Sequence, residues 1–197
     1  MKILTTLCLL VIFCVNTAFA IAPLNQNLIK QAHLYGSSQA RAELNVFLKP
    51  WVSYEEKAEN LNETAEAAYL YTPFLLIAMD AREKKLHNQL PRLEDSEKII
   101  TDYLDTLSFS VNLSGSTANF SSNTTAVLQQ KGKIIKSWHE AIPTTAQSAD
   151  KLHTKYEVQA YFYFDERELD LHAPVTLLIT TGDKKTHRFY FELSQIK

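Results

Sequence analysis

The chain has 197 residues and a formal net charge of −2, with 20 Lys and Arg against 22 Asp and Glu. This nearly neutral balance argues against general nucleic-acid binding, which needs a basic surface. Only four residues are glycine, so the chain has no glycine-rich loop of the kind that cradles a phosphate.

The first twenty residues predict an export signal. Lys2 supplies a positive start, residues 3–15 are mostly apolar, and Ala18-Phe19-Ala20 places small residues where a signal peptidase recognises them. The apolar stretch is shorter than the roughly 20 residues that a membrane-spanning helix needs. We therefore expect cleavage after Ala20 and an exported protein, periplasmic or extracellular, without stable membrane insertion after cleavage.

Both cysteines, Cys8 and Cys14, lie within this predicted signal, residues 1–20. The mature chain is therefore expected to have no disulfide, no thiolate metal ligand and no cysteine nucleophile. Lipidation of Cys14 is not expected, because the bulky Phe13 precedes it. A short signal followed by a chain without cysteine favours a bacterial source, and the four N-x-Ser/Thr sequons are then interpreted as chance matches.

The apolar spacing is helical from residue 24 to about residue 107. Leu28, Ala32 and Tyr35 follow a spacing of three to four, and Gly36 is expected to end this helix as its C-cap. A second helix is predicted within residues 37–50, where a serine can cap its start and a proline stops it.

Residues 55–69 are rich in Ala and Glu and predict a third helix. Thr72-Pro73 indicates the N-cap and first residue of a fourth, whose apolar start over residues 74–79 predicts a buried position. A strand through residues 69–77 is the competing interpretation, because a short apolar run is ambiguous by its period alone.

After a last helix that Asp95 or Ser96 is expected to cap, the apolar period changes to two. Strands are predicted at residues 107–114, 126–130, 134–139, 156–164, 175–179 and 187–193. Strands joined by turns without helices indicate an antiparallel sheet, and their number suits an immunoglobulin-like sandwich without the cysteine pair of a true immunoglobulin domain. The predicted fold is α+β, with a helical N-terminal region (21–106) packed against a C-terminal antiparallel immunoglobulin-like β-sandwich (107–197).

Residues suited to catalysis or metal binding are few. No two of the six histidines have the i, i+4 spacing that places two imidazoles on one zinc ion, and each is interpreted as a satisfied surface histidine. The acidic run 165–170 could offer carboxylates to calcium or a carboxylate pair for glycoside hydrolysis. Arg167 interrupts that run and no glycine makes a sharp turn, so a solvated loop is preferred. We predict no catalytic residue, no metal and no cofactor.

The ring-rich strand 156–164 separates its aromatic residues by face. Phe162 is assigned to the core, whereas Tyr161 and Tyr163 point the other way, and Tyr190 likewise lies opposite Phe191 in the last strand. We expect the two strands to be neighbours in one sheet, which would place the three tyrosines side by side. Cover by the N-terminal helices is the preferred interpretation of this face, and ligand binding by stacking and hydrogen bonding is the other.

The sequence favours an exported, non-catalytic binding or interaction protein with an unknown protein or glycan partner. Tyr161, Tyr163 and Tyr190 are its candidate ligand-binding residues. The alternative function is a hydrolase acting on cell-envelope or extracellular polymers. A cleft with two carboxylates about 5–10 Å apart would favour the hydrolase, and a flat tyrosine-bearing face would favour binding.

Overall fold

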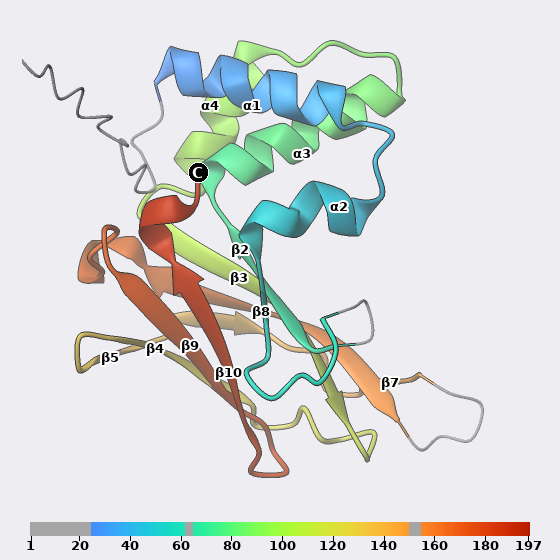
Figure 1. Ribbon diagram of the computed structural model, residues 1–197, viewed down its shortest axis with the longest axis vertical. Helices are drawn as coiled ribbons and strands as arrows, with labels where there is room; N and C mark the ends of the chain where they lie inside the picture. The colour runs from blue at the N-terminus through green and yellow to red at the C-terminus, as the bar shows by residue number, and fades with distance from the viewer. Residues whose placement is uncertain (1–24, 62–64, 150–154) are drawn as a thin grey trace, which may run out of the picture.

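The computed structural model describes residues 25–61, 65–149 and 155–197. These ranges contain both α-helices and antiparallel β-sheets, which confirms the predicted α+β class. Figure 1 shows the helices gathered at one end of the molecule, with the strands extending away from them. The predicted export signal lies outside the described residues.

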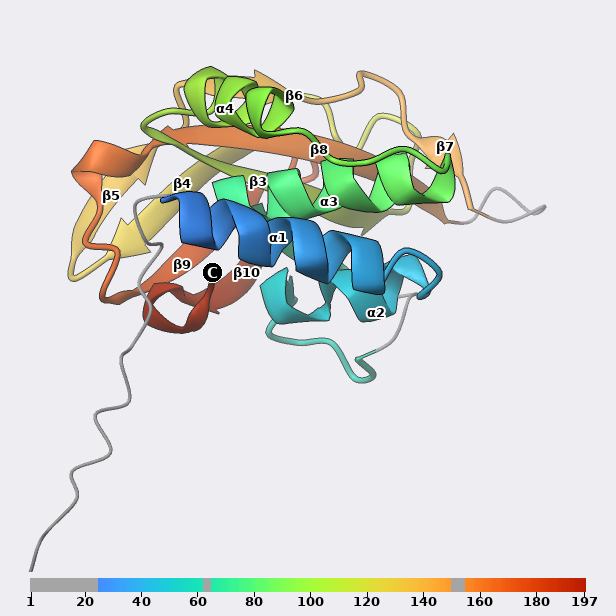
Figure 2. The same cartoon turned by 90° about the horizontal axis from the view of Figure 1, so that it is seen from above.

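The helical layer is built on two helices that lie side by side, α1 and α3 (Figure 2). Asn25 caps α1 by accepting hydrogen bonds from the backbone N–H groups of Asn27 and Leu28. Thr72 caps α3 by accepting from the N–H of Leu75, and a proline follows it, as predicted. The described helices are α1 (Gln26–Ser38), α2 (Leu44–Leu48), α3 (Pro73–Leu86) and α4 (Leu93–Asp102).

Gly36 does not end α1, contrary to the sequence prediction. The helix continues to Ser38, and Gly36 lies buried where α1 crosses α3. A Cβ atom added at Gly36 would lie 2.0 Å from the carbonyl oxygen of Ala78 in α3. This residue is therefore a glycine because the two helix backbones approach so closely there.

The predicted helix over residues 55–69 is also wrong, because this segment leads into a strand, β2 (Ala67–Tyr71). Ala68 and Leu70 of β2 are buried and pair with residues of the neighbouring strand. Pairing and burial override the helical preference of an Ala- and Glu-rich segment. The competing strand interpretation is right only as far as Tyr71, since α3 begins at Pro73.

Within the described residues, ten strands form two sheets, and both sheets are antiparallel, as the alternation and the tight turns predicted. Sheet A has the order β1 (Val52–Tyr54), β2, β3 (Thr106–Gly115), β8 (Tyr156–Asp165) and β6 (His139–Ala141), and β7 (Gln147–Ser148) also pairs with β8. Sheet B has the order β10 (Thr186–Glu192), β9 (Pro174–Thr180), β4 (Thr125–Gln130) and β5 (Lys133–Lys136). Strands β1 and β2 come from the region that the sequence predicted to be helical.

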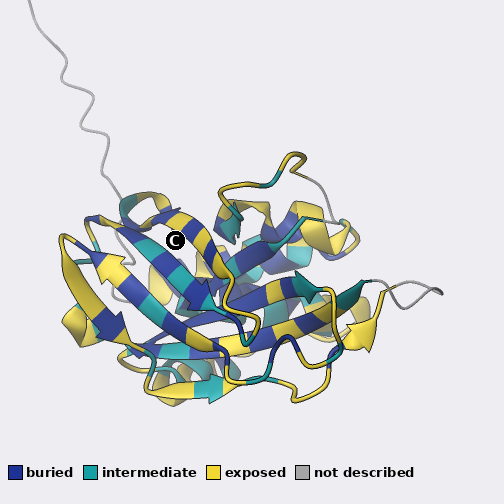
Figure 3. Ribbon diagram, turned by 90° about the horizontal axis from the view of Figure 1, so that it is seen from below, coloured by how far each residue is buried: buried dark blue, intermediate teal, exposed yellow. Residues whose placement is uncertain are grey.

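The inner faces of the two sheets meet in a core rich in phenylalanine. The Phe109 ring of β3 lies 5.2 Å from the Phe191 ring of β10 and 5.7 Å from the Phe164 ring of β8. Figure 3 shows buried and exposed residues alternating along the strands. The prediction that the phenylalanines of residues 156–164 and 187–193 point inward is confirmed.

The helical layer shares this core and is fastened to the end of sheet B. Trp51 stacks on Phe74 of α3 with ring centroids 6.1 Å apart. The Trp51 indole N–H and the Thr72 hydroxyl both donate to the carbonyl oxygen of Lys197, at 3.0 and 2.5 Å. Lys197 follows β10 through the short 3-10 helix η3 (Leu193–Gln195). These bonds fix the position of the helices over the strands.

Replacing Phe162 or Phe191 by Ala should lower the free energy of unfolding by about 3–5 kcal/mol, because each change leaves a cavity in the shared core. Urea denaturation measures the loss. The matched control is Tyr161→Ser, which lies on the same strand as Phe162 but on its outer face and should cost much less. Equal losses for Phe162→Ala and Tyr161→Ser would show that both faces of β8 are equally buried.

Candidate functional site

The three candidate tyrosines do not form one surface. Tyr161 and Tyr163 lie on β8 in sheet A, whereas Tyr190 lies on β10 in sheet B. All three point away from the shared core, but Tyr190 projects from the outer face of sheet B and the other two from the outer face of sheet A. The expectation that these strands are neighbours is wrong, because alternation assigns a residue to a face of its strand but does not identify the sheet that the strand joins. Tyr190 is 55% exposed and donates a hydrogen bond to Glu56.

Tyrosines flank a line of serines on the outer face of sheet A. Residues of β2, β3 and β8 align in two rows, Tyr71 with Ser108 and Tyr163, and Tyr69 with Ser110 and Tyr161. We call these six residues the tyrosine face. Both serines are buried between the larger side chains. The Gln159 side-chain amide extends the face by donating to the Ser110 hydroxyl at 2.9 Å.

Exposure of this face increases with distance from the helices. Tyr163 is half-buried, Tyr161 is 37% exposed, and Gln159 and Glu157 are exposed. Burial raises the pKa of Tyr163, and the nearby hydroxyls of Tyr103, at the end of α4, and Tyr161 raise it further. The structure thus divides the two tyrosines of β8 between the two interpretations, since Tyr163 is half-buried beside Tyr103 and Tyr161 is open to solvent.

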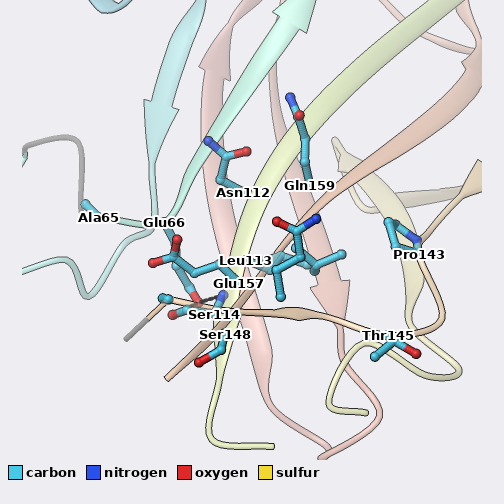
Figure 4. Close-up of a pocket in the computed structure, with 13 residues that line it drawn as sticks. Ala65, Glu66, Asn112, Leu113, Ser114, Pro143, Thr145, Ser148, Glu157 and Gln159 are labelled. Carbon is cyan, nitrogen blue, oxygen red and sulfur yellow. Dashed lines mark hydrogen bonds between the residues drawn. The ribbon is translucent and has the colours of Figure 1, made fainter. Parts of the chain in front are cut away.

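Beyond Tyr161 the open end leads into a groove of about 530 Å³. Its polar lining comprises three amides, three hydroxyls and two carboxylates, from Asn112, Gln147, Gln159, Ser114, Thr145, Ser148, Glu66 and Glu157. Figure 4 shows Ala65 and Glu66 on one side of the groove and Pro143 and Thr145 on the other. No local pattern of residue types indicates this groove, because its walls come from segments far apart in the chain.

The two carboxylates of the groove are already engaged. Glu66 accepts hydrogen bonds from the N–H and the hydroxyl of Ser114, at 2.8 and 2.9 Å, and lies 2.6 Å from Nδ1 of His187. Burial alone would raise the pKa of Glu66, but the bonds from His187 and Ser114 outweigh it and hold the pKa below its ordinary value. Glu157 forms an ion pair with Lys155 at 2.8 Å.

The interpretation of His187 as a surface histidine is wrong. Its contact with Glu66 joins the two sheets. His187 is buried on β10, and its partner Glu66 immediately precedes β2 of sheet A. Its Nε2 lies 3.5 Å from the hydroxyl of Thr181, which is buried and donates instead to Asp183 at 2.6 Å. This arrangement holds the hydroxyl in a structural bond and therefore does not present a nucleophile. The inward alternation of His187 with Phe189 and Phe191 is the signal that could have predicted its burial.

An exposed ring cluster lies at the helix-proximal end of the tyrosine face. We call Trp138, His139 and Tyr163 the aromatic cluster, because their ring centroids are 5.4–5.9 Å apart. Trp138 is 62% exposed, and its backbone N–H donates to the carbonyl oxygen of Tyr163 at 2.9 Å. Trp138 was missed because single exposed aromatic residues have no periodic pattern in a sequence.

The acidic run 165–170 is paired with basic residues. Asp165 accepts from the Arg167 guanidinium at 2.7 and 2.9 Å, and Asp170 lies 2.5 Å from the Lys131 ammonium. The Arg167 hydrogen bonds lower the pKa of Asp165 to about 2. Within the described residues no three or more His, Cys, Asp or Glu side chains are grouped so that they could hold a metal ion.

Comparison with protein-family models, with curated proteins and with solved structures finds no match to this chain. In the part of the chain that the structure describes, no helix has the length and apolar character needed to cross a membrane. Function therefore has to be inferred from the residues and geometry of sheet A.

Replacing Glu66 by Ala should lower the free energy of unfolding at pH 7 by about 1–3 kcal/mol, because Ser114 and His187 lose the carboxylate to which they are hydrogen-bonded. The pKa of Glu66 is lower in the folded state, so its stabilisation is complete above the unfolded-state pKa near 4.5 and is lost as the pH falls through the folded value. Urea denaturation from pH 7 to pH 3 should show the gap between the two proteins narrowing.

The control for this experiment is Lys133→Met, which breaks the exposed ion pair between Lys133 and Glu168. Its unfolding midpoint should stay close to that of the unmodified protein, since exposed pairs contribute little. A Glu66→Ala protein as stable as this control at pH 7 would show that the Glu66–His187 contact does not fasten the sheets.

Proposed function

We propose that the protein is an exported, non-catalytic binding module whose ligand lies along the outer face of sheet A. One observation carries the proposal. The outward residues of β8 change along one line from rings to polar groups, in the order Tyr163, Tyr161, Gln159 and Glu157. At about 3.3 Å per residue these four side chains span roughly 20 Å, which suits an elongated ligand.

Contacts to such a ligand would come from side chains rather than from a strand edge. On one side β8 pairs along its whole length with β3. On the other side β6 pairs with residues 161–163 and β7 with residues 156–157. These pairs occupy two separate stretches of that edge of β8 and leave only a short stretch, residues 158–160, between them for an added strand. The ligand would therefore lie across the exposed side chains.

Binding is favoured over hydrolysis because the acid–base groups of the groove have structural partners. Glu66 is bonded to Ser114 and His187, and Glu157 is paired with Lys155. A general acid or base needs to reach the bond that it cleaves. The immunoglobulin-like sandwich is part of the same proposal, since two facing antiparallel sheets leave their outer faces for recognition.

A retention experiment on insoluble polymers tests the binding function. The protein should be depleted from solution by at least one of peptidoglycan, chitin, cellulose and crosslinked gelatin. Combining Tyr161→Ser with Gln159→Ala should weaken retention at least tenfold, because both side chains lie in the proposed contact line. Circular dichroism verifies that the variants are folded.

Tyr190→Ser is the matched control, because it removes an exposed tyrosine from sheet B and should leave retention unchanged. Failure to bind any of the four polymers would contradict the proposal, and so would equal loss for Tyr190→Ser. Release of soluble fragments, abolished by Glu66→Gln, would replace binding by the alternative function, hydrolysis.

Export is the second part of the proposal and rests on residues 1–20 of the sequence. Expression in a bacterium should place the protein in the periplasm or the medium. Mass spectrometry of that protein should give an N-terminus at Ile21 and no attached lipid, because small residues precede the expected cleavage site. An intact leader, or diacylglycerol on Cys14, would contradict this localisation.

A further inference from the structure

We infer that the ligand of the sheet A face is a neutral oligosaccharide, one sugar of which stacks on Trp138 while the others follow β8 toward the groove. This inference rests on the proposed binding function and names its ligand class. Three features of the site carry it: an exposed indole held in place, neutral polar groups beyond it, and pairing of the carboxylates near those groups.

Trp138 has the properties of a stacking platform. Its ring lies 5.9 Å from Tyr163 and 5.7 Å from His139, yet its side chain remains 62% exposed. The other tryptophan, Trp51, is 2% exposed and packs among the helices. An indole supported by neighbouring rings and by a backbone hydrogen bond presents a large apolar area at little cost in conformational entropy. The C–H face of a pyranose ring is a matching surface.

The groove complements the hydroxyl groups of the remaining sugars. The amides of Asn112, Gln147 and Gln159 contain both donors and acceptors, and the hydroxyls of Ser114, Thr145 and Ser148 can act as either. Sugar hydroxyls also donate and accept. A few convergent polar groups of this kind orient a ligand that makes its apolar contacts elsewhere.

The distribution of charge favours a neutral ligand. The described lining of the groove contains no lysine or arginine, and the ammonium of Lys155 beside it is paired with Glu157 at 2.8 Å. An acidic polymer would have to displace Glu157 to reach this cation. Glu66 is bonded to His187 and Glu157 to Lys155, so both carboxylates already have a partner and would not favour a basic ligand. An extended peptide would find only a short stretch of the β8 edge to pair with, because β6 pairs with residues 161–163 and β7 with residues 156–157.

Acrylamide quenching of tryptophan fluorescence tests this inference directly, because Trp138 is exposed and Trp51 is buried. The neutral probes are hexasaccharides of cellulose, chitin and starch. Alginate oligosaccharides are the acidic probe, and gelatin peptides are the peptide probe. At least one neutral hexasaccharide should reduce the quenching constant saturably, by about twofold. Calorimetry should show affinity about tenfold weaker for Trp138→Ala.

Tyr190→Ser again serves as the control and should bind the hexasaccharide as the unmodified protein does. Protection of Trp138 by alginate or gelatin peptides alone would overturn the inference, as would no protection by any probe. If the polymers still retain the protein through Tyr161 while no neutral sugar protects Trp138, the ligand class is wrong and the binding function stands. If no polymer retains the protein, both fail.

Discussion

The pairing of β3 with β8 is the constraint on which the rest of the structure depends. Ten consecutive residue pairs join the two strands, from Thr106 with Asp165 to Gly115 with Tyr156. Phe109 and Phe162 thereby face the core together, and Ser110 and Tyr161 face outward together. A shift of one residue would exchange the two faces of a strand, which would bury the tyrosines and expose the phenylalanines.

Two groups of hydrogen bonds, one at each end of the molecule, hold sheet A in position. At one end Trp51 and Thr72 bind the carbonyl oxygen of Lys197, which ties the helices to the end of sheet B. At the other end Glu66 and His187 link β2 to β10. The tyrosine face lies between these two groups of hydrogen bonds. The strands that carry its side chains are therefore held in position, which would lower the entropic cost of the proposed binding.

Much of the fold could be predicted locally. The alternation in β8 and β10 correctly assigned Phe162, Phe191 and the tyrosines to opposite faces, and Thr72 correctly marked the start of α3. The segment before Tyr71 was assigned to a helix because its Ala and Glu content favours one. Its partner strand, β3, begins at Thr106, and no local pattern contains that contact.

The candidate site was predicted only in part, for the same reason. The sequence by itself determined which side chains of a strand are outward, because the two-residue period is a property of the strand's own backbone. Only the tertiary structure decided that Tyr190 belongs to the other sheet, that Trp138 lies beside Tyr163, and that Glu66 meets His187. These relations depend on strand order and on contacts between distant segments, and the free energy that selects them comes from pairing and burial across the whole core.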